Sequence, residues 1–300
     1  MNFINYHLGE LAALATAICW AGNAMFFENA GKKVGSFAVN YFRLFIGLFF
    51  LSIFTTLTRG HVFPIDADAH TWFWLFVSGI VGVVIGDMFL FEAFVVIGAR
   101  ISMLIMSLVP PTTALMGWLI LGEKMNYLEI SGMTVTVIGI SIVILERDSS
   151  SKQMKLSHPV KGVLFALGGM LGQAAGLILS KYGVREYNAF AATQIRLIAG
   201  IFGFTIIFIF RNNWKKLGWA LKDFHAITHI AAGSFLGPFI GISLSLIAVQ
   251  RAKVGIASTL IALSPLIITV FSIIFRHEKI FLKEVFGIII ALSGVVIFFL

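Results

Sequence analysis

Residues 40–47 read Asn-Tyr-Phe-Arg-Leu-Phe-Ile-Gly, and residues 193–200 read Thr-Gln-Ile-Arg-Leu-Ile-Ala-Gly. The Arg-Leu pair and the closing glycine recur at a shift of 153 residues, so Arg43 corresponds to Arg196. A stretch that recurs at a fixed shift is the signature of an internal repeat. We therefore expect the chain to contain the same unit twice, and this expectation decides the predicted fold.

Outward from these two stretches, further matches appear in the same order at a shift of 155 residues. They are Pro110 with Pro265, Glu123-Lys124 with Glu278-Lys279, Glu129 with Glu284, Gly132 with Gly287, and Gly139 with Gly294. The longest polar stretch of the chain separates the two copies. We therefore predict a first five-helix repeat over residues 1–146, a polar linker over residues 147–158, and a second five-helix repeat over residues 159–300.

The composition places both copies in a lipid bilayer. Of the 300 residues, 59% are hydrophobic and 12% are charged, and the mean hydropathy is +0.96, whereas a water-soluble domain is roughly a quarter charged. The 30 phenylalanines suit lipid-facing surfaces and the 29 glycines suit close helix packing. The net charge of +8 comes from basic residues that stand singly or in pairs between apolar stretches, so no nucleic-acid partner is expected.

A membrane-spanning helix needs about 20 mostly apolar residues. Such stretches lie near residues 9–29, 37–58, 72–97, 101–122, 127–145, 160–182, 190–210, 226–250, 254–275 and 281–300. Glu10 at the start of the first stretch, with no basic segment before it, favours a retained helix over a cleaved signal peptide. The predicted fold is an all-α membrane protein of ten transmembrane helices.

An odd number of crossings in each copy determines how the copies are related. The second copy must enter the membrane from the side opposite to the first, which predicts two inverted five-helix repeats about an axis in the membrane plane. Inverted repeats recur in secondary transporters, because equivalent halves around a central site can exchange an outward for an inward opening at similar energy. Channels with inverted halves also exist.

Several motifs resemble the EamA-type, ten-helix branch of the drug/metabolite transporter superfamily. They are Trp20 within Ile18-Cys-Trp20-Ala-Gly-Asn23, Arg43 within Tyr41-Phe-Arg43-Leu, the proline of the fourth stretch, and the Leu121-Gly-Glu123-Lys ending. The resemblance implies a proton- or gradient-coupled exporter or exchanger of amino acids, related metabolites or drugs. The second copy departs from the pattern, because Arg276-His277-Glu278 replaces the usual Gly-Glu.

The sequence offers little for enzyme or metal chemistry. The single cysteine, Cys19, excludes an internal disulfide and a cysteine-based metal site. The seven histidines lie mostly in expected loops or at helix ends, and we find no His-Glu-x-x-His motif or phosphate-binding loop. We therefore expect no enzyme activity, no metal and no cofactor.

Ionisable side chains within apolar spans are costly, at about 2.5 to 3.5 kcal/mol on insertion scales. Glu28, Asp87 and Glu92 are the candidates for a proton-coupling site, with Asp87 the deepest. Glu92 lies about 140° around the helix from Asp87, so both cannot point into one cavity. The alternatives are a structural hydrogen bond or ion pair for Asp87 and an interfacial position for Glu92.

A second group of polar residues marks the candidate substrate-binding site. It consists of Trp20, Asn23, Tyr41, Arg43, Gln194, Arg196 and Gln250. Trp20 and Asn23 share one helix face at the i, i+3 spacing, and Arg43 is a candidate clamp for a carboxylate or phosphate. The alternatives are a buried amide satisfied by a neighbouring helix for Asn23 and snorkelling to the headgroups for Arg43.

The predicted cavity lies between the first four helices of each copy, with the fifth and tenth helices peripheral. We expect it to be acidic toward one mouth, through Glu28, Asp87 and Glu92, and basic toward the other, through Lys181 and Arg196. Prolines should kink the fourth and ninth helices. Glycine stripes should pack the third and sixth helices closely; they are Gly79, Gly82 and Gly86, then Gly168, Gly172 and Gly176. In the eighth helix, Gly237-Pro238 and Gly241 are expected to serve close packing, with a hinge as the alternative.

Two indications of orientation disagree. Six loop lysines and arginines lie on the side of the termini and fourteen on the other side, so the positive-inside rule places both termini outside the cytoplasm. The family resemblance implies that both are inside.

The favoured function is a secondary transporter, exporter or exchanger, of a small organic metabolite such as an amino acid or a drug-like solute, working by alternating access, with proton coupling as an open option. The alternative is a channel-like or structural membrane subunit without coupled transport. The expected partners are a small-molecule substrate and the lipid bilayer, and the protein is expected to be a monomer or a homodimer. The expected location is the inner or plasma membrane of a prokaryote.

Overall fold

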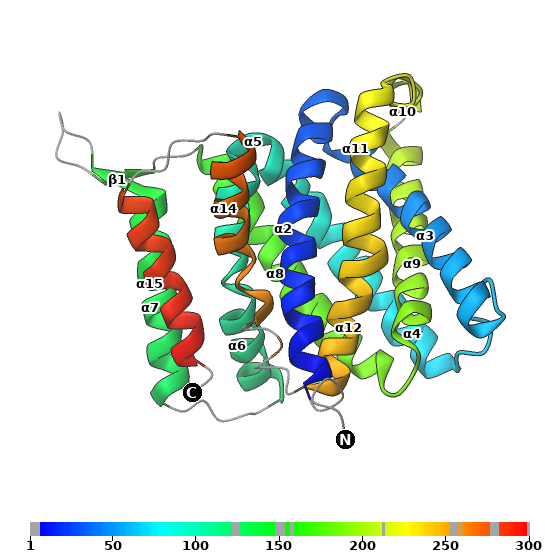
Figure 1. Cartoon of the computed structure of the whole chain (residues 1–300), viewed down its shortest axis with the longest axis horizontal. Helices are drawn as coiled ribbons and strands as arrows, with labels where there is room; N and C mark the ends of the chain where they lie inside the picture. Colours follow the sequence, from blue (N-terminus) through cyan, green and yellow to red (C-terminus); the bar gives the residue numbers. More distant parts are fainter. Residues whose placement is uncertain are drawn as a thin grey trace.

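The computed structural model of the chain describes residues 7–121, 127–147, 154–156, 159–211, 214–252, 257, 260–276 and 282–298. Almost all of these residues are in helices that run side by side as a bundle (Figure 1). The Glu123-Lys124 ending and its counterpart Glu278-Lys279, with His277, lie outside the described residues.

The first half of the chain follows the predicted spans with one difference. Its helices are α2 (Leu8–Val34), α3 (Ser36–Arg59), α4 (Ala69–Ser78), the π-helical η1 (Gly79–Gly86), α5 (Asp87–Met106), α6 (Val109–Leu121) and α7 (Tyr127–Ile144). The third predicted span is the continuous rod of α4, η1 and the first part of α5, which bends at Gly98 (φ 79°). The fourth is not continuous, because a turn at Ser107 and Leu108 separates the end of α5 from α6.

The second half repeats this order. Its helices are α8 (Val160–Val184), α9 (Ala189–Arg211), α10 (Trp214–Ala220), α11 (Phe224–Ser234), the π-helical η2 (Phe235–Gly241), α12 (Ile242–Arg251), α14 (Ser264–Arg276) and α15 (Leu282–Phe298). The predicted linker contains most of a short antiparallel hairpin of β1 (Leu145–Arg147) and β2 (Met154–Leu156). Neither this hairpin nor α10 was predicted from the sequence.

Six helical segments in the described part of the chain are long and apolar enough to cross a membrane. They are Leu8–Val34, Ser36–Arg59, Ala69–Met106, Val160–Val184, Ala189–Phe210 and Phe224–Arg251. Shorter apolar helices cover Ile130–Ile142, Ser264–Phe275 and Val285–Gly294. The chain is therefore a helical, multi-pass membrane protein.

Local irregularities recur in the two halves at the shift of 155 residues. The side chain of Asp68 caps α4 by accepting a hydrogen bond from the amide of Thr71, and Asp223 caps α11 by accepting one from the amide of Ala226. Both helices then pass into a π-helical segment, η1 or η2. A π segment inside an α-helix changes which residues face a given side, so its repetition preserves the same rotation in both halves.

The fourth span and its counterpart are also interrupted at equivalent positions. Turns at Ser107 to Leu108 and at Ala262 to Leu263 each come just before a proline. A proline lacks the amide that an α-helix needs and clashes with the preceding turn. The predicted kinks are thus present as complete breaks in the helix.

Glycine contacts draw α8 against the π segment η1. A Cβ on Gly172 would lie 2.5 Å from the Cα of Gly86, and one on Gly176 would lie 2.8 Å from the Cα of Gly82. The backbones therefore touch directly, as expected for glycine stripes in a membrane bundle. Gly168, on the same stripe, faces the ring of Phe89 instead.

Equivalent helices of the two halves pack directly on each other. In the pair α3 and α9, Gly200 faces Leu44 and Gly47 faces Leu197, and the shift of 153 residues exchanges these two contacts. The residue number rises along one helix while it falls along the other, so the equivalent helices are antiparallel.

The pair α7 and α15 repeats this arrangement at the opposite edge of the bundle (Figure 1). A Cβ on Gly139 would lie 2.3 Å from the amide nitrogen of Ala291, and one on Gly294 would lie 2.3 Å from that of Thr136. The shift of 155 residues exchanges these contacts too. Because α7 and α15 pack mainly on each other at this edge, they are peripheral to the rest of the bundle.

Candidate functional site

A cavity of about 110 Å³ lies between the two halves of the bundle. Its described lining comes from α2, α3, η1, α5, α6, α8, α9, η2, α12, α14 and residues 261–262 before α14, while α7 and α15 contribute none of it. These elements are the eight helices that the sequence analysis expected around the cavity. We call this space the central cavity.

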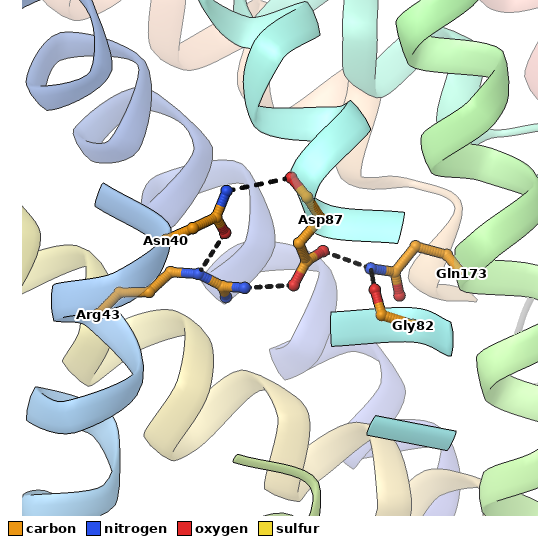
Figure 2. A network of polar contacts seen from close by, with 5 residues as sticks. All are labelled: Asn40, Arg43, Gly82, Asp87 and Gln173. Atoms are coloured by element: carbon orange, nitrogen blue, oxygen red, sulfur yellow. Dashed lines mark hydrogen bonds and ion pairs between the residues drawn. The ribbon is translucent and has the colours of Figure 1, made fainter. Parts of the chain in front are cut away.

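A network of polar side chains, shown in Figure 2, includes three residues that line the central cavity: Arg43, Asp87 and Gln173. Arg43 on α3 forms an ion pair with the carboxylate of Asp87 at the start of α5. Arg43 Nε also donates to Asn40 Oδ1 at 3.0 Å, and Asn40 Nδ2 donates to the backbone oxygen of Asp87 at 3.3 Å. Gln173 on α8 donates to Asp87 Oδ1 at 2.5 Å and lies 3.4 Å from the carbonyl oxygen of Gly82. Both carboxylate oxygens of Asp87 therefore have partners.

The network is held against an aromatic wall. The guanidinium of Arg43 lies 4.6 Å from the ring centre of Phe91 and 5.8 Å from that of Phe27. Cation–π contacts of this kind are strongest where the cation is desolvated, and the Arg43 side chain is only 4% exposed. Phe94 extends the wall beyond Phe91, with ring centres 5.3 Å apart. Arg43 is thus a buried, paired cation and does not snorkel to the membrane surface.

Arg196 on α9 also lines the central cavity and has a different environment from its repeat partner. It is 5% exposed, it lines the central cavity, and its Nε is buried without a hydrogen-bond partner among the described residues. Gly82 makes room for it, because a Cβ there would lie 3.1 Å from Nη2 of Arg196. Arg196 is near enough to Asp87 for an electrostatic interaction.

Trp20 and Asn23 on α2 both line the central cavity, on the shared face that the sequence predicted. They pack against η2 of the other half: a Cβ on Gly237 would lie 2.3 Å from Asn23 Nδ2, and one on Gly241 would lie 3.0 Å from the Trp20 ring. Glycine at these two positions is therefore a packing requirement.

The structure places two of the predicted substrate-binding residues away from the cavity lining. Tyr41 has its hydroxyl 3.3 Å from Thr205 Oγ1. Gln194 donates to Ser52 Oγ at 3.3 Å and to the carbonyl oxygen of Val62 at 2.8 Å. These contacts join α3 to α9, and the shift of 153 residues converts the Tyr41 contact with Thr205 into the Gln194 contact with Ser52.

Gln250 also has structural partners, at the end of the bundle where α2 begins. It donates to the carbonyl oxygens of Arg185 at 2.9 Å and Tyr187 at 2.7 Å in the loop between α8 and α9. The hydroxyl of Tyr187 donates to Asp66 at 2.9 Å, and Arg59 forms an ion pair with Asp66 at 2.5 Å. We call the loops at residues 60–68 and 185–188, joined by these contacts, the loop clasp.

The ionisable side chains of the loop clasp are shifted by their contacts. Burial alone would raise the pKa of Asp66, but the hydrogen bond from Tyr187 and the charge of Arg59 hold it below its ordinary value. Burial raises the pKa of the Tyr187 hydroxyl. The clasp therefore contains an ionised carboxylate with a neutral phenol over the ordinary pH range.

The other two predicted proton-coupling residues lie apart from the cavity lining. Glu28 forms an ion pair with Lys32 at 2.5 Å within α2. Glu92 accepts a hydrogen bond from the hydroxyl of Ser36, at the start of α3. Of the three candidates, only Asp87 lines the central cavity.

These positions correct the predicted charge distribution. An acidic mouth and a basic mouth were expected, but Asp87 pairs with Arg43 and also interacts electrostatically with Arg196. Lys181 is exposed, and Glu28 is not among the lining residues. Among the described residues, the ionisable groups that line the central cavity are therefore two arginines and one aspartate, because the packing of α3, α5 and α9 brings them to one cavity.

Gln173 is a lining residue that the sequence reasoning missed. It occupies the repeat position of Trp20 at the shift of 153 residues, and it is an amide within an otherwise apolar span. That correspondence was available from the sequence. The apolar lining of Met103 and Met106 was not predictable in this way, because methionine in a membrane helix carries no signal of its own.

Across the part of the chain that the structure places, no group of three or more histidine, cysteine, aspartate or glutamate side chains is arranged to hold a metal ion.

Comparison with known proteins agrees with this architecture. The sequence model of the EamA-like transporter family matches residues 7–145 and 160–300, once in each half of the chain. A protein of Archaeoglobus fulgidus named "Uncharacterized transporter" is 22% identical over 291 residues, which cover 97% of each chain. A solved structure described as "Crystal structure of protein" has the same fold, with a TM-score of 0.66 and 16% identity over 97% of this chain and 96% of that chain.

Proposed function

The chain belongs to the EamA-like transporter family, and from this premise we propose that it is a secondary transporter that moves a small organic metabolite across the membrane by alternating access. It acts as an exporter or exchanger in the cell membrane of a prokaryote. The observation that carries this proposal is the central cavity, in which side chains from both halves of the chain surround a buried charged network. Buried charges in a membrane bundle mark solute or ion pathways.

The proposal takes the two halves as inverted five-helix repeats, residues 1–146 and 159–300, with ten spans in all. Its support is the exchange of contacts between equivalent antiparallel helices in the pairs α3 with α9 and α7 with α15. A two-fold axis that relates antiparallel partners in this way lies in the membrane plane, as in transporters built from inverted repeats.

Alternating access requires that each mouth of the cavity close in one state. At the end where α2 begins, the loop clasp joins the first half to the second through Asp66 and Tyr187. At the other end, α10 packs with α2 and α3 through Leu217, Ala220 and Ala38. The contacts at one end are polar and those at the other end are apolar, so breaking them requires different amounts of free energy.

We assign coupling to Asp87. Protonation would remove the negative charge that holds Arg43, and the change in electrostatic energy is available to shift the balance between the two open states. Glu28 and Glu92 lie near the α2 to α3 turn with their own partners, so we assign them no coupling role.

The experiment is counterflow in reconstituted vesicles, with labelled amino acids and related metabolites as the panel. In a Cys19→Ala background, Asp66→Cys and Tyr187→Cys are joined by a short, cleavable thiol cross-linker across the loop clasp. Alternating access predicts that cross-linking abolishes counterflow and that cleavage restores it.

Each single-cysteine variant, treated with the same reagent, is the matched control and should keep its rate. Full counterflow by the cross-linked protein would exclude opening at this mouth. No counterflow of any compound by the wild-type protein would remove the transporter assignment itself.

A further inference from the structure

Among the residues that the structure describes, the lining of the central cavity carries one more positive than negative charge. Its ionisable lining groups are Arg43, Asp87 and Arg196. Arg43 takes one carboxylate oxygen of Asp87 and Gln173 takes the other. Both carboxylate oxygens are therefore engaged, one by a side chain of α3 and the other by a side chain of α8. Among the described contacts, Arg196 interacts with the carboxylate only through its charge.

The repeat shows which groups around Arg43 have no counterpart around Arg196. Its equivalent, Arg43, is held by Asn40 and Asp87. At the equivalent positions the second half has Thr193, at the shift of 153 residues, and Ile242, at the shift of 155. Isoleucine accepts no hydrogen bond, and Thr193 Oγ1 donates to the carbonyl oxygen of Ala189 and accepts from Ser243.

The guanidinium of Arg196 is nevertheless buried, where a missing hydrogen-bond partner is not replaced by water and costs free energy. Arg196 is 95% buried, since its exposed fraction is 5%, and its Nε has no hydrogen-bond partner among the described residues. An unpaired buried cation is strongly unfavourable, because burial removes its hydration without replacing it. The second half thus keeps the arginine at the cavity wall and lacks both groups that would neutralise it.

We propose that Arg196 is the anchor for the carboxylate of a small monoanionic solute, whose apolar part packs against Phe91, Phe94, Met103 and Met106. This inference rests on the proposed transport function and names its substrate class. A single negative charge balances the cavity, whereas a dianion such as phosphate would leave it negative. The wall of aromatic and methionine side chains favours an apolar body over a polyhydroxylated one.

The experiment compares isosteric compounds that differ in charge. Binding of 3-methylbutanoate, 3-methylbutanamide and 3-methylbutylamine to the purified full-length protein is measured by isothermal titration. A second series carries a 3-phenylpropyl skeleton with the same three groups. In at least one series the carboxylate should bind about tenfold or more tightly than its amide, because a charge-assisted bidentate contact replaces a neutral one, and the amine should bind most weakly.

Variants connect this preference to one residue. Arg196→Gln should reduce the ratio of carboxylate to amide affinity to near one, and Arg196→Lys should keep most of it. Arg251→Gln removes an exposed arginine at the end of α12 and should leave the ratio unchanged. Since Arg196→Gln is open to misfolding, the wild-type ratio alone is also decisive: equal or weaker binding of the carboxylate in both series, or no binding of either carboxylate, would overturn the inference.

Flux separates this inference from the transport proposal. If the wild-type protein takes the labelled carboxylate up into vesicles and Arg196→Gln does not, the result supports both the anion site and the transport proposal. Binding that depends on Arg196 without any vesicle flux would refute the transport proposal and leave the anion site. Counterflow of neutral or cationic solutes that Arg196→Gln leaves intact would refute the anion site and leave the transporter.

Discussion

At the scale of single residues, the chemistry of the central cavity depends on one acid between two bases. Asp87 binds Arg43 directly, and Arg196 interacts with it at longer range. The side chains of Arg43 and Asp87 are 4% and 8% exposed, so their charges are compensated by each other and not by water. Loss of Asp87 and loss of Arg43 should therefore destabilise the protein to different extents.

Asp87→Asn should destabilise the protein more than Arg43→Gln. The first change leaves two buried arginines without an acid, and the second leaves Asp87 with Arg196 still near. Breaking a buried pair costs about 3 to 5 kcal/mol, and we expect Asp87→Asn at that level with Arg43→Gln below it. Denaturation in detergent measures both. The reverse order would show that Arg196 does not compensate Asp87.

The double variant, with Asp87→Asn and Arg43→Gln together, completes a double-mutant cycle with the two single variants. Removal of both partners should cost less than the sum of the single changes, by roughly 1 to 3 kcal/mol for residues in direct contact. Additive costs would indicate that the pair contributes no coupling energy.

At the scale of elements, the π segments and glycine contacts determine which side chains reach the cavity. Asp87 follows η1 directly, and η1 is pressed against α8 by the Gly172 and Gly86 contact. A change at this contact therefore displaces the segment that positions Asp87.

Gly172→Ala should lower the free energy of unfolding by about 1 to 3 kcal/mol, the usual range for overpacking. The added Cβ would lie 2.5 Å from the backbone of Gly86, which cannot rotate away. Gly168→Ala, whose Cβ would lie 3.1 Å from the ring of Phe89, should cost less because that side chain can move. Gly218→Ala, with nothing within 4 Å, is the matched control. Equal costs at positions 172 and 218 would refute the backbone contact.

At the scale of the whole molecule, inversion makes a prediction about sidedness. Ile65 and Leu221 are exposed residues in the loops that precede α4 and α11, which are equivalent helices. In a Cys19→Ala background, Ile65→Cys and Leu221→Cys should be labelled by a membrane-impermeant thiol reagent from opposite sides of the membrane. Labelling from the same side would refute the inverted arrangement. The same assay in intact cells decides which side the loop clasp faces.

Much of this architecture was predictable from the sequence. The repeated Arg-Leu stretch, the mean hydropathy and the family motifs indicated a duplicated membrane transporter, and the match to the EamA-like transporter family confirms that membership. The spacing of Asp87 and Glu92 also indicated that they face different ways, in agreement with their separate contacts. The helical period of 3.6 residues per turn depends only on neighbouring residues, so the relative direction of two residues on one helix is predictable from the sequence.

Hydropathy and the internal repeat were sufficient to predict a membrane protein with two related halves, and to predict which helices surround the cavity. The contacts between distant side chains appear only in the folded molecule: Arg43 is bound by Asp87, and Arg196 Nε has no hydrogen-bond partner among the described residues. The same holds for Tyr41, Gln194 and Gln250, which bind groups outside the cavity lining. The reason is that these contacts depend on how each helix is rotated about its own axis. The π segments and helix breaks change the face that each later residue presents, and the glycine contacts set how closely helices approach, so the meeting of side chains from distant helices depends on the packed whole.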